Sequence, residues 1–391
     1  MLSEGTVEYG GRAAAALLGV DALYRSESGD GEGLVVLNMA TPGELSPHAF
    51  GSYGEARARF ETLEAEAHGL PEADRRTYYR QLCRSTLAFI RWREEGLPFP
   101  AQLGSFLKVP TAPAPREAMD RILRSLLTLL TEMGYGGDLK AQCTAWEERN
   151  RVPPEEVEGV LEALMDEAWE RTEERVMEIP APRSDGMGIA AVSGVAYNAR
   201  CDYRTRTIEL NTDPVLTRPG LKHLAVHEGY PGHYLQFKVR ETTFREGSAP
   251  ADNLLSVVNT VSSSVFEGIA DTGLEMLDWR SDGDDRVLAL LNRHRAGIGT
   301  QAAWRLHALG WPRGKVTDWL RSQSLVGGDG WVENRMAFIA APSRAVLIWS
   351  YWWGEEVVAP VWRQVPVERR TDFLRFLYGR MHSNETVGMF D

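Results

Sequence analysis

The segment from His227 to His233, which reads His-Glu-Gly-Tyr-Pro-Gly-His, places two imidazoles and a carboxylate close together in the chain. Imidazole nitrogen is the commonest protein ligand of a catalytic zinc ion, and a glutamate beside the first histidine serves as general base in helices with the HExxH motif. In that motif the second histidine stands four residues after the first, but this position is Pro231 here. The segment therefore indicates metal chemistry with an altered ligand spacing.

Helix geometry shows what this spacing requires. Each helical residue turns by about 100°, so on an ideal helix His233 would lie about 240° from His227 and could not share its metal. Pro231 has no N–H to donate to the carbonyl of His227, and its ring clashes with that carbonyl. Gly232 tolerates the backbone angles needed to resume the helix. We expect a bulge that absorbs two residues and returns His233 to the position of an i+4 ligand. The alternative is a kinked helix with two unrelated histidines.

Two histidines need a third protein ligand, with water in the fourth position of a catalytic zinc site. Glu267 is the candidate because it follows on the next strongly helical segment among apolar neighbours, where a buried carboxylate needs a cation. Glu275, further along the same segment, is the alternative ligand. Asp271 shares the face of Glu267 and is placed to accept the second N–H of a ligating histidine. Glu228 is then a base for metal-activated water rather than a ligand.

A hydrolytic site also needs a donor that stabilises the oxyanion formed in the reaction. The sequence leaves this role open among several residues, namely Tyr351, Arg344, His307, His382 and Tyr197. We take Tyr351 and His307 as candidate catalytic residues, and Arg344 and Tyr197 as candidate substrate-binding residues. A basic residue such as Arg344 at the end of a blocked cleft would favour recognition of a free carboxylate.

Composition narrows the class of protein. The chain has 391 residues, 43% of them hydrophobic, which supports a substantial core. A formal net charge of −12 argues against a nucleic-acid or anionic-membrane partner. The three widely spaced cysteines predict a reducing compartment without a disulfide framework. No signal peptide and no long apolar segment stand out, so we expect a cytoplasmic protein that binds no membrane.

Hydrophobic periodicity predicts a mainly α, multi-helix fold. Apolar residues recur at helical spacing over nine segments, which are 53–68, 72–94, 116–133, 153–176, 253–278, 284–309, 315–322, 331–353 and 369–381. A loop is expected over 179–194, and the alternation in 207–210 predicts a strand in a small sheet or hairpin beside the metal-binding helix. Thr217 is the expected cap of that helix and Pro219 opens it. We expect an N-terminal helical region over 1–180 and a metal-binding catalytic region over 181–391, packed as one unit.

The HExxPGH block, followed by Leu235-Gln236 and a downstream Glu267-Gly268, resembles the bacterial "domain of unknown function 885" family. That family is similar in turn to zinc carboxypeptidases of the Taq type and to other largely helical gluzincins. The resemblance runs from about Gly194 to the C-terminus. It implies a metallopeptidase-like fold, zinc ligands at His227, His233 and Glu267, and Glu228 as base.

The same resemblance implies that the strand around Ile208 forms one wall of the cleft, and that Tyr351 and His307 approach the site. Two departures from the family pattern stand out. Tyr234 replaces a second histidine after the PGH, and Pro342-Ser343-Arg344-Ala345 replaces Pro-Gly-Gln-Ala. We therefore carry over the metal site rather than the substrate preference.

The resulting hypothesis is a zinc-dependent hydrolase that cleaves a peptide or another amide with one Zn²⁺ ion, with Fe²⁺ and Mn²⁺ as alternative metals. Two histidines and a carboxylate also suit non-haem iron, so a non-hydrolytic metalloenzyme of a small-molecule biosynthetic pathway is one alternative. A non-catalytic binding protein with a vestigial metal site is the other. Glu228 argues against the latter, because a structural zinc has no need of an adjacent base.

Overall fold

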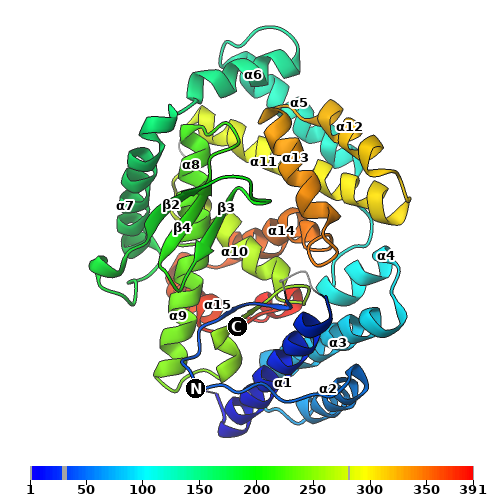
Figure 1. Cartoon of the computed structure of the whole chain (residues 1–391). Helices are drawn as coiled ribbons and strands as arrows, with labels where there is room; N and C mark the ends of the chain where they lie inside the picture. The colour runs from blue at the N-terminus through cyan, green and yellow to red at the C-terminus, as the bar shows by residue number, and fades with distance from the viewer. Residues whose placement is uncertain (1, 29–32, 281, 391) are drawn as a thin grey trace. The chain divides into compact units, whose positions relative to one another are not determined.

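The computed structural model describes residues 2–28, 33–280 and 282–390, and these are mainly helical with two small sheets (Figure 1). The prediction of a mainly α fold with a small β element is confirmed at this level. No helix of the described residues is long and apolar enough to cross a membrane.

The regular elements follow in chain order. The α-helices are α1 (Glu4–Ser28), α2 (Tyr53–Ala67), α3 (Ala73–Glu95), α4 (Phe99–Gln102), α5 (Arg116–Glu132), α6 (Leu139–Asn150), α7 (Val157–Arg175), α8 (Arg218–Leu224), α9 (His233–Arg245), α10 (Ser263–Met276), α11 (Gly283–Ala303), α12 (Arg313–Gln323), α13 (Gly328–Ala340), α14 (Ile348–Gln364), α15 (Arg370–Gly379) and α16 (Asn384–Val387). The strands are β1 (Val35–Asn38), β2 (Gly188–Val192), β3 (Ala199–Asp202), β4 (Thr207–Asn211) and β5 (Leu255–Val257).

The chain divides into two compact units. The first contains residues up to Thr111, Gln236–Ile269 and the residues from Trp353 on, and the second contains Ala112–Leu235 and Ala270–Trp352. Three boundaries between the units fall inside helices: after Leu235 in α9, after Ile269 in α10 and after Trp352 in α14. Each unit therefore contains segments from both halves of the chain, and the predicted division at residue 180 stays a prediction.

The first unit contains α1 to α4, α15 and α16, and a two-stranded antiparallel sheet of β1 and β5. Its core includes Tyr9, Phe60 and Tyr79, all buried. Tyr79 donates a 2.9 Å hydrogen bond to the buried Asp252, just before β5. In this sheet Val35 pairs with Val257, so a long-range strand forms where the sequence pattern predicts the start of a helix. The helix predicted over 253–278 accordingly begins only at Ser263.

The second unit holds the three-stranded sheet, in the order β2-β4-β3, with β2 parallel and β3 antiparallel to the central β4. The strand predicted over 207–210 is β4, and Figure 1 shows the sheet beside α7 and α8. Helices α5, α6 and α11 enclose a separate hydrophobic cluster around Trp146. Trp146 Nε1 donates a 2.7 Å hydrogen bond to Asp284 at the start of α11.

The helix predicted over 331–353 is two helices, α13 and α14. Pro342 explains the break, because a proline disfavours the helical conformation of the residue before it. Ala341 is accordingly extended, with φ −74° and ψ 121°. Four helices of the described residues, α1, α4, α6 and α16, were not predicted from the sequence.

Candidate metal centre

The chain reaches the two histidines through a helix that changes type. Thr217 caps α8, since its hydroxyl accepts the N–H of Gly220 at 3.2 Å, and Pro219 lies in the first turn as predicted. The helix then passes into a π-helical turn over Ala225–Gly229. The N–H of Tyr230 donates back across five residues to the carbonyl of Ala225, at 3.1 Å. The chain is irregular from Tyr230 to Gly232, and α9 begins at His233. The bulge expected from the sequence is therefore this π-turn and the break that follows it.

Gly232 is required at this break by lack of space. A Cβ atom at this position would lie 1.9 Å from the carbonyl oxygen of His227 and 2.3 Å from that of Val226. The Gly232 N–H donates to the carbonyl of Val226 at 2.9 Å, which holds the two segments together. The close approach of backbone to backbone, rather than an unusual φ angle, explains the glycine.

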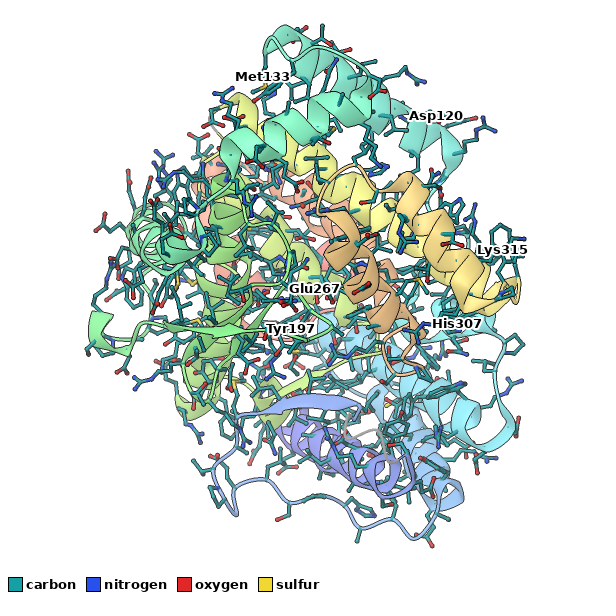
Figure 2. All side chains as sticks on the ribbon, turned by 45° about the horizontal axis from the view of Figure 1, so that its top comes forward. Asp120, Met133, Tyr197, Glu267, His307 and Lys315 are labelled. Carbon is teal, nitrogen blue, oxygen red and sulfur yellow. The ribbon has the colours of Figure 1, made fainter. Side chains whose placement is uncertain are left out.

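The three predicted ligands lie close together. One ligand atom each from His227, His233 and Glu267 falls within 4.8 Å of the others, and all three residues are buried. The two imidazole rings have centroids 4.7 Å apart and are nearly perpendicular. Glu267, labelled in Figure 2, precedes Asp271 by one turn of the same helix, α10.

Two glycines of α10 allow close packing around Glu267. A Cβ at Gly273 would lie 2.6 Å from Val226, in the π-turn, so this part of α10 packs directly on the histidine-bearing segment. A Cβ at Gly268 would lie 2.2 Å from the carbonyl oxygen of Gly354 in α14. The small residues thus fix the position of the helix that carries Glu267.

The carboxylate of Asp271 lies beside the ring of His227. Its Oδ1 lies 3.0 Å from Nδ1 of His227, which orients the ring and directs Nε2 away from the carboxylate. His223 belongs to the same neighbourhood, with its ring centroid 5.3 Å from that of His227. Burial, together with the nearby His227, lowers the pKa of His223 to about 4, so its imidazole is neutral at pH 7. His223, His227 and Asp271 form a second group of closely spaced ligand atoms.

Glu228 is buried and its side chain turns to the sheet. Its Oε2 accepts the backbone N–H of Cys201 at 2.9 Å. Cys201 lies in β3, an edge strand, so an N–H that does not pair with β4 is used to hold this carboxylate. Sequence reasoning did not find this contact. The family resemblance pointed instead to the strand around Ile208, which is the central strand β4. The side chain of Ile208 packs beside Gly229.

The predicted substrate-binding residues gather around α13. Phe338 on this helix has the guanidinium of Arg344 5.7 Å from its ring centroid, and the ring of Tyr351 at 6.1 Å. The carbonyl of Tyr197 accepts a hydrogen bond from Asn334 of the same helix at 3.2 Å. The hydroxyl of Tyr197 donates a hydrogen bond to Glu209. Burial, together with this bond, raises the pKa of Tyr197 to about 12, so the hydroxyl stays protonated.

Three other residues lie outside the metal group. His307 is in another π-helical turn, Trp304–Ala308, where its Nε2 lies 2.6 Å from the carbonyl oxygen of Ile339. Figure 2 shows it apart from Tyr197. Glu275, the alternative ligand, has an oxygen 3.8 Å from Nη1 of Arg280, and neither it nor His307 belongs to a metal-ligand group among the described residues. Tyr234, which replaces the family histidine, donates its hydroxyl to the carbonyl of Asp185 at 2.9 Å.

Comparison with known proteins shows the fold and leaves the activity open. No protein-family model matches the chain, and no curated protein matches it in sequence. A candidate lipoprotein from Colwellia psychrerythraea is similar in structure, with a TM-score of 0.56 and 14% identity over 78% of this chain and 54% of that protein. A candidate lipoprotein of unknown function from Shewanella oneidensis has a TM-score of 0.52 and 13% identity, over 86% of this chain and 71% of that one. The chain thus spans about half the length of the Colwellia protein.

Proposed function

We propose that this protein is a zinc-dependent hydrolase of amide bonds, with a metallopeptidase-like active site, and that it belongs to the "domain of unknown function 885" family. The observation that carries the proposal is the convergence of His227, His233 and Glu267, with ligand atoms within 4.8 Å of one another beside the buried Glu228. An adjacent carboxylate that is not itself in the ligand group is what distinguishes a hydrolytic metal site from a structural one.

The residues fit a zinc ion in their chemistry. Two imidazoles and one carboxylate are the donors of many catalytic zinc sites, which keep one position open. Glu267 is buried, and a buried carboxylate is costly unless a cation neutralises it. Asp271 at Nδ1 of His227 fixes the tautomer that offers Nε2 as a ligand. A zinc ion held here supplies Lewis acidity, which polarises a substrate carbonyl and acidifies water.

Glu228 performs the proton transfers of the proposed reaction. Because Oε2 is held by the N–H of Cys201, Oε1 is the oxygen that takes a proton from the attacking water. The same oxygen then returns that proton to the leaving amine. The side chains of Tyr351 and Arg344 are the candidate donors to the carbonyl oxygen and to the rest of the substrate. Tyr197 is a candidate substrate contact through its ring, because its hydroxyl already donates to Glu209.

Substitution of Glu228 tests this function. In Glu228→Gln we expect amide hydrolysis, measured as amine release from a panel of short peptides and acyl amino acids, to fall by about 10²–10⁴-fold. The metal content of the variant should match the wild type, because Glu228 is not a ligand. The exposed Glu148→Gln is a matched control that should keep full activity. Unchanged turnover in Glu228→Gln would show that the base is another residue.

The same donor set favours one alternative. Two histidines and one carboxylate also form the facial triad that holds non-haem Fe²⁺, and such a site would run a non-hydrolytic reaction. Metal analysis of the purified protein, followed by chelation and return of either Zn²⁺ or Fe²⁺, separates the two. Recovery of hydrolysis with Zn²⁺ supports the proposed function, and recovery of an oxygen-dependent reaction with Fe²⁺ alone contradicts it.

A further inference from the structure

Arg335 on α13 is a half-buried cation without an acidic partner. Among the described residues no carboxylate forms an ion pair with it, and its buried Nε has no hydrogen-bond acceptor. Its guanidinium lies instead 5.5 Å from the ring centroid of Phe338 and 5.7 Å from that of Trp331. Burial lowers the pKa of Arg335, yet a guanidinium keeps its charge at neutral pH. A charge withdrawn from water in this way is costly unless an anion pairs with it.

Two neighbouring side chains also have a buried N–H without an acceptor, although the carboxylate of Glu147 lies near Arg295 and acts to raise its pKa. Arg295 on α11 has its guanidinium 5.5 Å from the same Trp331 ring, and its Nε is also buried without an acceptor. The indole Nε1 of Trp331 is a third such donor. Buried donors in native proteins are nearly always satisfied by protein, water or a ligand. Three N–H groups in one part of the second unit are therefore available to an acceptor from outside the described residues.

The same helix carries the proposed substrate-binding residues. The ring of Phe338 has Arg335 on it, and Arg344 and Tyr351 beside it. Asn334, next to Arg335, donates to the carbonyl of Tyr197. Tyr197 in turn precedes β3, whose Cys201 holds Glu228. Within the second unit Arg335 thus neighbours Asn334, which binds Tyr197, and Tyr197 stands four residues before the Cys201 that holds the proposed base.

We propose that Arg335, which shares the ring of Phe338 with Arg344, binds an anionic oxygen group of the substrate, a carboxylate or a phosphate. The inference rests on the proposed function, because it assigns the class of substrate to the same site. A planar guanidinium with several donors matches the geometry of either group. The amide substrates of this enzyme therefore carry a negatively charged group.

Binding of a matched pair of ligands tests the inference. Hippurate and hippuramide differ only in that a carboxylate is replaced by a neutral amide, and inorganic phosphate is the third probe. Calorimetry is performed on the whole chain carrying Glu228→Gln, which prevents turnover of the ligands. We expect hippurate to bind at least about tenfold more tightly than hippuramide, because hydrogen bonds to charged groups are worth more than neutral ones.

Variants assign this preference to a residue. Arg335→Met should weaken hippurate binding by about 10–100-fold and leave hippuramide binding unchanged, whereas Arg335→Lys should recover part of the loss. Arg370→Met is the matched control, because Arg370 also lies over a tryptophan ring, 4.3 Å from the centroid of Trp362, but in the first unit. Circular dichroism melting shows that each variant is folded.

The outcomes separate this inference from the proposed function. Phosphate that displaces hippurate and depends on Arg335 would support an anion site, and phosphate that also binds more tightly than hippurate would be its preferred group. Equal binding of hippurate and hippuramide, or a carboxylate preference that survives Arg335→Met, would overturn the inference. A protein that hydrolyses amides yet shows no such preference would leave the proposed function intact. Loss of the proposed function, with the Arg335-dependent preference retained, would leave a binding site without that chemistry.

Discussion

At the scale of single residues, the proposed centre depends on one carboxylate that is not itself a ligand. Asp271 accepts from Nδ1 of His227 at 3.0 Å, which sets the tautomer and orientation of that ring. Carboxylates in this role raise the basicity of a ligating imidazole and fix its position. His223 lies beside the pair as a neutral imidazole. Metal affinity should therefore depend on Asp271 as well as on the three ligands.

Asp271→Asn tests this role. We expect zinc affinity to fall by about 10–100-fold, because the amide can still accept the hydrogen bond but no longer carries the charge. Competition with a fluorescent chelator gives the affinity directly. Asp278→Asn is the control, since Asp278 is an exposed acid that pairs with Arg175 at 3.3 Å. An unchanged affinity in Asp271→Asn would show that this carboxylate has only a packing role.

The residues near the site differ in how well the sequence predicts them. Glu267 and Asp271 could be chosen because apolar neighbours and four-residue spacing on one helix are local properties. The hydrogen bond from Cys201 to Glu228 could not, because it depends on the edge position of β3 in a sheet with strands from distant segments. The cluster of Arg295, Trp331 and Arg335 was missed for the same reason, since it joins two helices.

At the scale of elements, the π-turn over Ala225–Gly229 and the break before α9 make the ligand spacing possible. Gly232→Ala should destabilise the protein by about 1–3 kcal/mol or more, because the added Cβ would lie 1.9 Å from a backbone oxygen. Gly229→Ala is the control, since its Cβ would lie 3.9 Å from the nearest atom outside its own segment. Chemical denaturation measures both. Equal stability of the two variants would contradict the close approach.

Element boundaries show where local patterns are overridden. The helix predicted from residue 253 begins later than predicted, because residues 255–257 form the strand β5. This strand pairs with β1, more than two hundred positions earlier in the chain. The predicted bulge, in contrast, followed from two residues, Pro231 and Gly232, whose constraints are local. Local chemistry thus predicted the shape of the segment with the two histidines better than it predicted the surrounding fold.

At the scale of the whole molecule, the chain forms two units that share helices α9, α10 and α14. A boundary placed by composition at residue 180 does not show this sharing, because contact between distant segments is absent from a linear pattern. Buried titratable groups make the free energy of unfolding depend on pH.

His382 gives the first unit a defined response to acid. Burial, and then the nearby Arg75, lower its pKa to about 3, while an unfolded histidine titrates at about 6.5. Between these values the unfolded chain binds a proton that the folded chain does not, so this residue lowers the free energy of unfolding as the pH falls from 6.5 to 3. In His382→Gln we expect the free energy of unfolding to fall less across that window than in the wild type, by a difference on the order of a few kcal/mol.

Urea unfolding at several pH values between 4 and 7 measures the effect of His382→Gln. The exposed His48→Gln controls for the loss of one imidazole. Asp252, whose pKa burial raises to about 6, acts in the opposite direction, because it holds a proton in the folded state that the unfolded chain has lost. The comparison is therefore between the variant and the wild type at each pH. Parallel pH profiles would contradict the assigned histidine.

The central claim is that three side chains hold one metal ion, and metal analysis of the purified protein tests it most directly. The wild type and Glu275→Gln should each carry one zinc ion per chain after loading with Zn²⁺ and gel filtration, because Glu275 is outside the ligand group. His233→Ala and Glu267→Gln should lose most of the metal while remaining folded by circular dichroism. A wild-type protein that purifies without metal and cannot be loaded, or a Glu267→Gln variant that keeps its full zinc content, would contradict the account.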